Sequence, residues 1–153
     1  MRSYLMVDTD PVSLDERERD EFLESGNTGV LSLSVPDDAP HSIPVSYGYD
    51  SVDEVFYFRL AVGPDTKKGS LDGRPVSFVV YGRHADVWKS VVASGALRET
   101  TADDVALQSL EGLERVHIPL VDIFGEPVEN VSFEFYRLDP EQITGRVEET
   151  IPE

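Results

Sequence analysis

Cysteine is absent from the 153-residue chain. Without thiols the protein cannot form a disulfide framework, a thiolate zinc site, an iron–sulfur cluster or a cysteine nucleophile. Long apolar runs are missing too: no stretch approaches the roughly 18 residues of a membrane-spanning helix, and the amino-terminal residues reach Asp8 before an apolar signal segment could form. A chain of 153 residues has the size of one domain, so we expect a single domain, residues 1–153, and we expect it in the cytoplasm.

Lysine is scarce. The chain has 3 Lys and 10 Arg against 30 Asp and Glu, and its formal net charge is −17. Nucleic acids and anionic membranes attract basic surfaces, so we expect neither as a partner. The acidic residues extend from Asp8 to Glu153, a distribution that resembles the surfaces of proteins from salt-accumulating archaea. With 40% apolar residues the chain can still fill a core, and we attribute the acidity to the solvent rather than to the substrate.

Several catalytic signatures are also missing. His41, His84 and His117 lie 43 and 33 residues apart, so we predict no metal site. The segment Gly63–Ser70 superficially resembles a phosphate loop, but both lysines precede its second glycine, so the Gly-Lys-Ser/Thr order of a nucleoside triphosphatase is lacking. No Gly-x-Ser-x-Gly elbow and no Gly-x-Gly-x-x-Gly dinucleotide fingerprint occurs. The chemistry must therefore come from other residues.

Alternating apolar residues dominate the middle of the chain and predict strands over residues 28–35, 42–49, 55–60, 76–81, 87–97 and 131–138, with a shorter one at 143–148. Pro44 lies inside one of these runs and indicates an edge or bulged strand. Residues 36–40, 50–54 and 82–86 have the composition of turns and loops.

Helix signals are few and short. Ser13 and Glu16 form a capping-box pattern for a helix that ends before Gly26. Thr101 is the expected N-cap of a second helix, which carries Val105, Leu107 and Leu110 and runs to Gly112. A two-turn helix is expected after Gly63, while residues 114–129 predict either a short helix or a loop.

Strand follows strand with little helix for parallel crossovers, so the sheet should be mostly antiparallel. The pattern predicts a mainly β (α+β) fold, a six-stranded antiparallel split β-barrel with short flanking helices. A β-sandwich is the alternative.

All three lysines stand in contexts that could bind a ligand. Thr66, Lys67 and Lys68 occupy the turn where a strand gives way to a helix. A hydroxyl, ammonium groups and backbone N–H groups there could hold a phosphate monoester, although a solvated basic turn has the same pattern. Lys89 follows the only tryptophan, Trp88. Alternation puts Lys89 and Trp88 on opposite strand faces. The alternative to a ligand-binding role is that Trp88 is core filler and Lys89 a solvent-facing residue.

Taken in order, these segments resemble the FMN-binding split-barrel family related to pyridoxamine 5′-phosphate oxidase, and most closely its nitroimidazole-reductase-like branch. The resemblance covers about residues 13–138. The segments that carry it are Gly29-Val30-Leu31-Ser32-Leu33, His41-Ser42-Ile43-Pro44-Val45-Ser46-Tyr47, Val55-Phe56-Tyr57-Phe58-Arg59, Gly63-Pro64-Asp65-Thr66-Lys67-Lys68-Gly69-Ser70-Leu71, Val76-Ser77-Phe78-Val79-Val80 and Trp88-Lys89-Ser90-Val91-Val92-Ala93-Ser94-Gly95.

The resemblance implies a cofactor and a set of residues that bind it. The cofactor would be FMN, at the interface of a homodimer. Backbone groups of one strand would lie beside the isoalloxazine, the end of the next strand would line it, the turn lysines would hold its phosphate, and the tryptophan-bearing strand would reach the FMN of the partner subunit. In this chain the corresponding residues are Ser42, Ile43, Pro44, Val45 and Ser46, then Phe58 and Arg59, then Thr66, Lys67 and Lys68, and finally Trp88, Lys89 and Ser90.

The function that the resemblance implies is that of an FMN-dependent oxidoreductase acting on a small organic molecule. Two departures bear on the reaction. The acidic tail lacks the Arg- and His-bearing segment that holds pyridoxal phosphate in the true oxidase, and Arg59-Leu60 stands where some nitro-reducing members have a histidine. We assign no catalytic side chain. The alternatives are a non-catalytic flavin or haem module, with His84 as the nearest axial ligand, and a partner-binding barrel with an empty pocket.

The charge balance predicts a response to salt. At −17 the folded chain repels itself, and molar KCl shortens the Debye length to about 3 Å, so the melting temperature should rise between low and molar KCl. Over the same range the affinity of the folded dimer for FMN should fall or level off, because salt screens the lysine–phosphate attraction. A melting temperature that stays flat or declines would instead indicate a surface for a basic partner.

Overall fold

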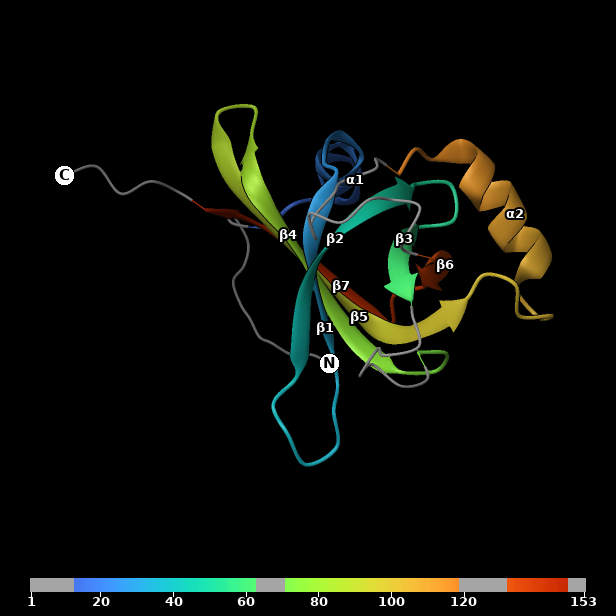
Figure 1. Ribbon diagram of the computed structural model, residues 1–153. Coiled ribbons are helices and arrows are strands. Elements are labelled where there is room, and N and C mark those ends of the chain that lie inside the picture. Colours follow the sequence, from blue (N-terminus) through green and yellow to red (C-terminus); the bar gives the residue numbers. More distant parts are fainter. Residues whose placement is uncertain (1–12, 63–70, 119–131, 149–153) are drawn as a thin grey trace.

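The computed structural model describes residues 13–62, 71–118 and 132–148 (Figure 1). Within these residues the chain forms two helices and seven strands, in the order α1 (Glu16–Ser25), β1 (Thr28–Leu33), β2 (His41–Asp50), β3 (Val55–Val62), β4 (Pro75–His84), β5 (Val87–Glu99), α2 (Ala106–Arg115), β6 (Ser132–Leu138) and β7 (Gln142–Glu148). The expected helix after Gly63 and most of residues 114–129 lie outside the described residues. Neither described helix is long and apolar enough to cross a membrane.

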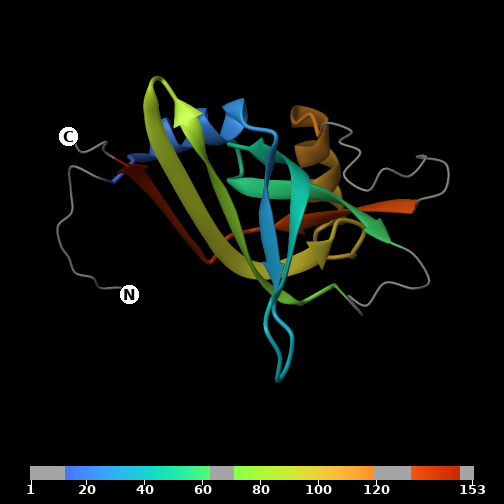
Figure 2. The ribbon, with the colours of Figure 1, turned by 60° about the vertical axis from the view of Figure 1, so that its left-hand side comes forward.

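The sheet closes on itself. Its strand order is β4-β1-β2-β3-β6-β5-β7, and β4 also pairs with β5, so six strands form a closed ring. Every pairing is antiparallel. The long strand β5 curves around the barrel and pairs on its other edge with β6 near Leu97 and with β7 from Trp88 to Ser94 (Figure 2). The predicted six-stranded split barrel is therefore confirmed, with β7 as an additional strand, and the sandwich is wrong.

Aromatic rings fill the barrel. Phe78 on β4 meets Phe58 and Phe56 on β3 edge-to-face, with ring centroids 4.7 and 5.4 Å apart, and all three side chains are buried. Tyr47 from β2 packs against Phe78 in the same way, at 5.3 Å. Such pairs add about 0.5–1.5 kcal/mol each beyond the burial of their area. The strands are thus held around one interdigitated aromatic cluster.

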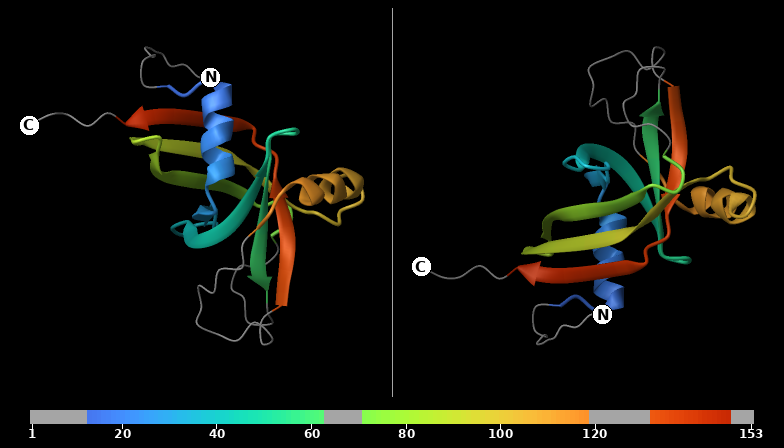
Figure 3. Two further views of the ribbon diagram at one scale, coloured as in Figure 1. Left: turned by 90° about the horizontal axis from the view of Figure 1, so that it is seen from above. Right: turned by 90° about the horizontal axis from the view of Figure 1, so that it is seen from below.

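Helix α1 crosses one end of the barrel and buries Phe22 and Leu23 (Figure 3). Its N-cap is Asp15, in a capping box with Glu18, so the predicted box at Ser13 and Glu16 is wrong by two residues. The reason is tertiary: the Leu14 N–H donates to the Gly145 carbonyl of β7 at 3.1 Å, which keeps the chain extended up to Asp15. The predicted end before Gly26 is confirmed.

Helix α2 lies beside β3 and β6 and differs more from expectation (Figure 3). It begins at Ala106 after Val105, which caps no N–H with its side chain, so the predicted N-cap Thr101 is wrong. The expected apolar face is also wrong, because Leu107 and Leu110 are 70% and 61% exposed.

Small residues bring α2 close to the sheet. Ser109 and Gly112 are the buried residues of the helix. The Arg137 guanidinium of β6 donates to the Ser109 hydroxyl at 3.0 Å, and a Cβ at position 112 would overlap the Tyr57 hydroxyl of β3. Gly112 therefore lies within α2 and contacts the sheet, and the prediction that the helix runs only to Gly112 is wrong.

Two further details correct the sequence analysis. The β4–β5 connection is a two-residue turn at Ala85 and Asp86, both with positive φ, and not a loop over residues 82–86, because the ladder continues to His84 and Val87. Alternation over residues 131–138 predicts Phe133 and Phe135 on one face and Tyr136 on the other; in β6 the buried face carries Tyr136 and Leu138, whereas Phe135 is exposed.

Because α2 lies so close to the sheet, we predict that alanine at position 112 destabilises the protein, although alanine normally stabilises a helix relative to glycine. Gly112→Ala should lower the free energy of unfolding by about 1–3 kcal/mol, because the new methyl group displaces the buried Tyr57 ring or the helix. An exposed helical glycine would gain about 1 kcal/mol from the same change. Gly82→Ala is the control, since a Cβ there meets no atom within 4 Å. Equal denaturant midpoints for the two variants would contradict this packing.

Candidate functional site

Strand β2 changes its pairing partner halfway along. Residues 41–46 pair with β1, whereas the ladder with β3 covers only Tyr47–Asp50. Beyond Phe58, β3 continues to Val62 in its ladder with β6. In the part of the chain that the structure describes, no strand therefore pairs with the first half of β2 on its β3 side. The barrel is split at this place.

The register decides which backbone groups face the split. The Tyr47 N–H donates to the Asn27 carbonyl at 2.9 Å, so the odd residues of β2 bond to β1 and the even residues point their N–H and C=O groups to the other side. Ser42 thus presents an N–H and a carbonyl there, and Pro44 a carbonyl alone. The nitrogen of Pro44 points away from β1, so its missing N–H costs the β1–β2 ladder no hydrogen bond. This confirms the prediction that Pro44 lies on an edge. Along a short line the edge therefore offers the Ser42 N–H, the Ser42 carbonyl and the Pro44 carbonyl.

The predicted side chains around this edge lie at different depths. Ser42 and Pro44 are exposed, Ile43 is half-buried, and Val45 and Ser46 are buried. The Ser42 hydroxyl is hydrogen-bonded to the Ser32 hydroxyl at 2.7 Å. These residues form one continuous segment, as the sequence analysis expected.

The two residues of β3 that the resemblance placed beside the cofactor, Phe58 and Arg59, differ in burial. Phe58 is buried between Phe56 and Phe78, so its ring belongs to the core. Arg59 is half-buried, and its guanidinium lies 5.0 Å from the Phe133 ring centroid. Thr66, Lys67 and Lys68 lie outside the described residues, and their role stays a prediction.

The outer face of the barrel carries an exposed apolar patch, here called the outer sheet face and formed by Val30, Tyr81, Trp88 and Val92. Val30 and Val92 both flank Val79 in adjacent ladders. The rings of Tyr81 and Trp88 are 5.5 Å apart, and their side chains are 70% and 40% exposed. Ser90 pairs with Tyr81 and is half-buried. Exposed apolar patches of this kind are typical of interaction surfaces.

Lys89 lies on the opposite face of β5 from Trp88, as strand alternation predicted. Its side chain is only 7% exposed, and its Nζ lies 3.3 Å from His84 Nδ1. The His84 ring packs edge-on against Phe22 of α1, with centroids 6.0 Å apart. The interpretation of Trp88 as core filler and Lys89 as a solvent residue is therefore wrong. Lys89 is buried within the chain, next to the His84 ring that packs against α1.

The tyrosines near the core supply no base. Burial raises the pKa of the Tyr47 phenol, which donates to the Leu23 carbonyl at 2.7 Å. Burial and the adjacent Glu134 carboxylate raise the pKa of Tyr136, whose hydroxyl donates to that carboxylate at 3.0 Å. Both phenols stay protonated at neutral pH. Among the described residues no cluster of three or more His, Asp or Glu side chains is placed to hold a metal ion.

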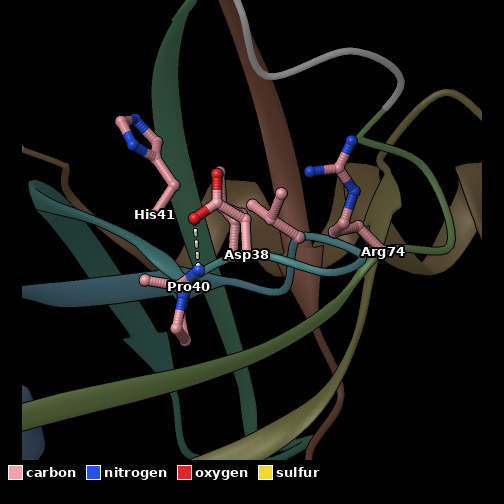
Figure 4. A pocket seen from close by; sticks show the side chains of 7 residues that line it. Asp38, Pro40, His41 and Arg74 are labelled. Carbon is pink, nitrogen blue, oxygen red and sulfur yellow. Dashed lines mark hydrogen bonds between the residues drawn. The ribbon is translucent and has the colours of Figure 1, made fainter.

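A pocket that sequence reasoning missed lies where the β1–β2 hairpin meets the start of β4 (Figure 4). Its volume is about 190 Å³, and it is lined by Leu33, Val35, Asp38, Ala39, Pro40, His41 and Arg74. Arg74 donates to the Ser34 carbonyl at 3.4 Å, and Asp38 accepts from the Ala39 N–H at 2.7 Å. No sequence signal could have revealed it, because residues 33–41 and Arg74 meet only through the β1–β4 pairing.

Comparison with known proteins shows which family the chain belongs to. The family described as pyridoxamine 5′-phosphate oxidase matches residues 15–147. No curated protein matches the chain in sequence.

Solved structures share the fold at low sequence identity. An FAD-binding protein from Mesorhizobium loti is 23% identical with a TM-score of 0.65, over 92% of this chain and 100% of that one. An FAD-binding protein from Mycobacterium smegmatis is 20% identical with a TM-score of 0.63, over 88% and 96%. An FAD- and haem-binding protein from the same organism is 15% identical with a TM-score of 0.62, over 94% and 76%.

Proposed function

Because the chain belongs to the pyridoxamine 5′-phosphate oxidase family, we propose that it is a flavoprotein and that the isoalloxazine ring of FMN, or of another flavin, binds at the split of the barrel. The observation that carries this proposal is the open backbone edge of β2 from Ser42 to Ser46. Structural neighbours named as FAD-binding proteins support a flavin in general.

The open edge suits the pyrimidine side of a flavin. That side offers an N–H donor flanked by two carbonyl acceptors, and the even residues of β2 offer N–H and carbonyl groups in a line. Hydrogen bonds from backbone groups cost no side-chain entropy to form, because the strand is already ordered. The chain would orient the ring through Ser42, Pro44 and Ser46, while the half-buried Ile43 supplies an apolar contact.

Charge supports a phosphate contact at the turn. Lys67 and Lys68 are two of only three lysines in the chain, next to the Thr66 hydroxyl. Ammonium groups form charge-assisted hydrogen bonds with phosphate, each contributing roughly 1.5–3 kcal/mol. Retention of two adjacent lysines in a chain with so few favours a specific anionic ligand.

The outer sheet face supports a homodimer. Tyr81 and Trp88 form an exposed aromatic pair next to the apolar row through Val30 and Val92. A second copy of the chain would cover this face by two-fold symmetry, and Trp88 and Ser90 would then be the residues that reach the flavin of the partner subunit.

The proposed activity is oxidation or reduction of a small organic molecule. The flavin, when bound, supplies the electron or hydride transfer. The chain's own contribution is to bind and orient the ring and to exclude water from it. No described side chain is assigned as a catalytic acid or base.

His84 is a poor haem ligand on geometric grounds. The Lys89 ammonium has no lone pair, so in their 3.3 Å contact it must donate to Nδ1. Lys89 thus occupies Nδ1, and the ring itself packs against Phe22 of α1, so the imidazole is engaged within the fold. We therefore favour flavin over haem.

The phosphate contact predicts a difference between two flavins. Lys67→Ala/Lys68→Ala should weaken FMN binding by roughly 2–5 kcal/mol and leave riboflavin nearly unchanged, because only FMN carries the phosphate. Calorimetric titration, together with the visible spectrum of the purified protein, measures both. Arg17→Ala removes a cation from the exposed face of α1 and is the control. Equal losses for FMN and riboflavin would defeat the assignment.

The dimer predicts a link between assembly and affinity. Tyr81→Glu/Trp88→Glu should shift the protein from dimer to monomer in sedimentation and lower its flavin affinity, because each site needs both subunits. Leu107→Glu/Leu110→Glu on α2 is the matched control, since those leucines are at least as exposed but lie elsewhere. A flavin-saturated wild-type monomer at micromolar concentration would rule out the shared site.

A further inference from the structure

Helix α2 packs against the sheet through small residues and turns two leucines away from it. Ser109 and Gly112 are the buried residues of the helix, whereas Leu107 and Leu110 are 70% and 61% exposed. Residues three apart in a helix share a face, so these two leucines lie side by side. Among the described elements none lies beyond α2, which forms one edge of the molecule (Figures 1 and 3). The fold itself therefore makes little use of these two apolar side chains.

Carboxylates frame the leucine pair. Glu111 and Glu114 each follow one of the leucines by four residues, so they extend the same face, and both are exposed. Arg115, the only cation of α2, is paired with two carboxylates of strand β2 and the turn after it. We call Leu107, Leu110, Glu111 and Glu114 the outer helix face. It combines two apolar side chains with two negative charges.

The charge of the outer helix face selects among the molecules that could cover it. A second copy docking through the same face would bring four carboxylates together, because a two-fold interface repeats each residue. An anionic membrane would be repelled by the same carboxylates. A protein segment with apolar side chains flanked by Lys or Arg matches both the leucines and the carboxylates. A helical segment suits the surface best, because the side-chain ridges of one helix pack into the grooves of another.

We propose that the outer helix face binds a basic amphipathic helix of a protein partner, with the leucines against its apolar stripe and the carboxylates against its flanking cations. Phe135 of β6 adds a third exposed apolar side chain. By alternation it shares a strand face with Arg137, which donates to Ser109 of α2, and it is 40% exposed. The outer helix face contains no residue assigned to the flavin or to the homodimer, so this inference does not depend on the proposed function.

The test titrates the full chain with two synthetic peptides of about 18 residues, long enough to form a helix. Both carry leucines at helical spacing, and the other positions are Lys in one peptide and Glu in the other. At one KCl concentration the Leu/Lys peptide should bind with a dissociation constant at least tenfold below that of the Leu/Glu peptide. Leu107→Glu/Leu110→Glu should raise the Leu/Lys constant at least tenfold, although it makes the protein more acidic. Leu107→Gln/Leu110→Gln keeps the charge and a good helix former at both positions, and should raise it at least tenfold as well.

Gln108→Glu is the matched control. It adds a carboxylate at an exposed position of α2 that lies one and two residues from the leucines and does not share their face, so it should leave the Leu/Lys constant unchanged or lower it. Melting temperatures check that each variant is folded. A smaller change than tenfold in either leucine variant would mean adsorption by charge alone and would overturn the inference. Equal binding of the two peptides, or no binding of the Leu/Lys peptide to the wild type, would overturn it too.

Discussion

The change of partner in β2 is the constraint on which the rest of this structure depends. Its second half must pair with β3 to bring Tyr47 and Tyr49 into the aromatic core, and its first half must pair with β1 to close the ring through β4 and β5. A single strand cannot follow two diverging neighbours over its whole length. The barrel therefore splits, and the split leaves a backbone edge that can recognise a ligand without any special side chain.

Three arginines of this acidic chain join one element to another. Arg115 of α2 pairs with the buried Asp50 of β2 at 2.8 Å, and the Asp50 hydrogen bond raises the pKa of the guanidinium. Arg19 of α1 reaches Glu54 in the β2–β3 turn at 2.8 Å. Arg98 joins Asp72 and Asp104. In a chain of net charge −17 such pairs hold the helices and turns on the barrel.

One face of β5 is buried in the fold and the other is exposed to solvent. Lys89, Val91 and Ala93 point inward and are buried, whereas Trp88 and Val92 point outward and are exposed. An ammonium is thus enclosed while an indole is solvated, the reverse of what hydrophobicity alone would assign. The enclosed Lys89 contacts His84, and among the described residues the exposed indole packs against the Tyr81 ring.

Local chemistry in the sequence determined the strand pattern, the edge character of Pro44, the end of α1 at Gly26 and the ordered motifs of the family, because each depends on neighbouring residues or on strict alternation. The tertiary structure decided three other features. The start of α1 depends on β7, which bonds Leu14 in an extended conformation, and the buried face of α2 depends on the close contact of Gly112 with Tyr57. The burial of Lys89 depends on the packing of α1 over the end of β5. The pocket at Arg74 is likewise tertiary, since pairing of β1 with both β2 and β4 is what brings its two segments together.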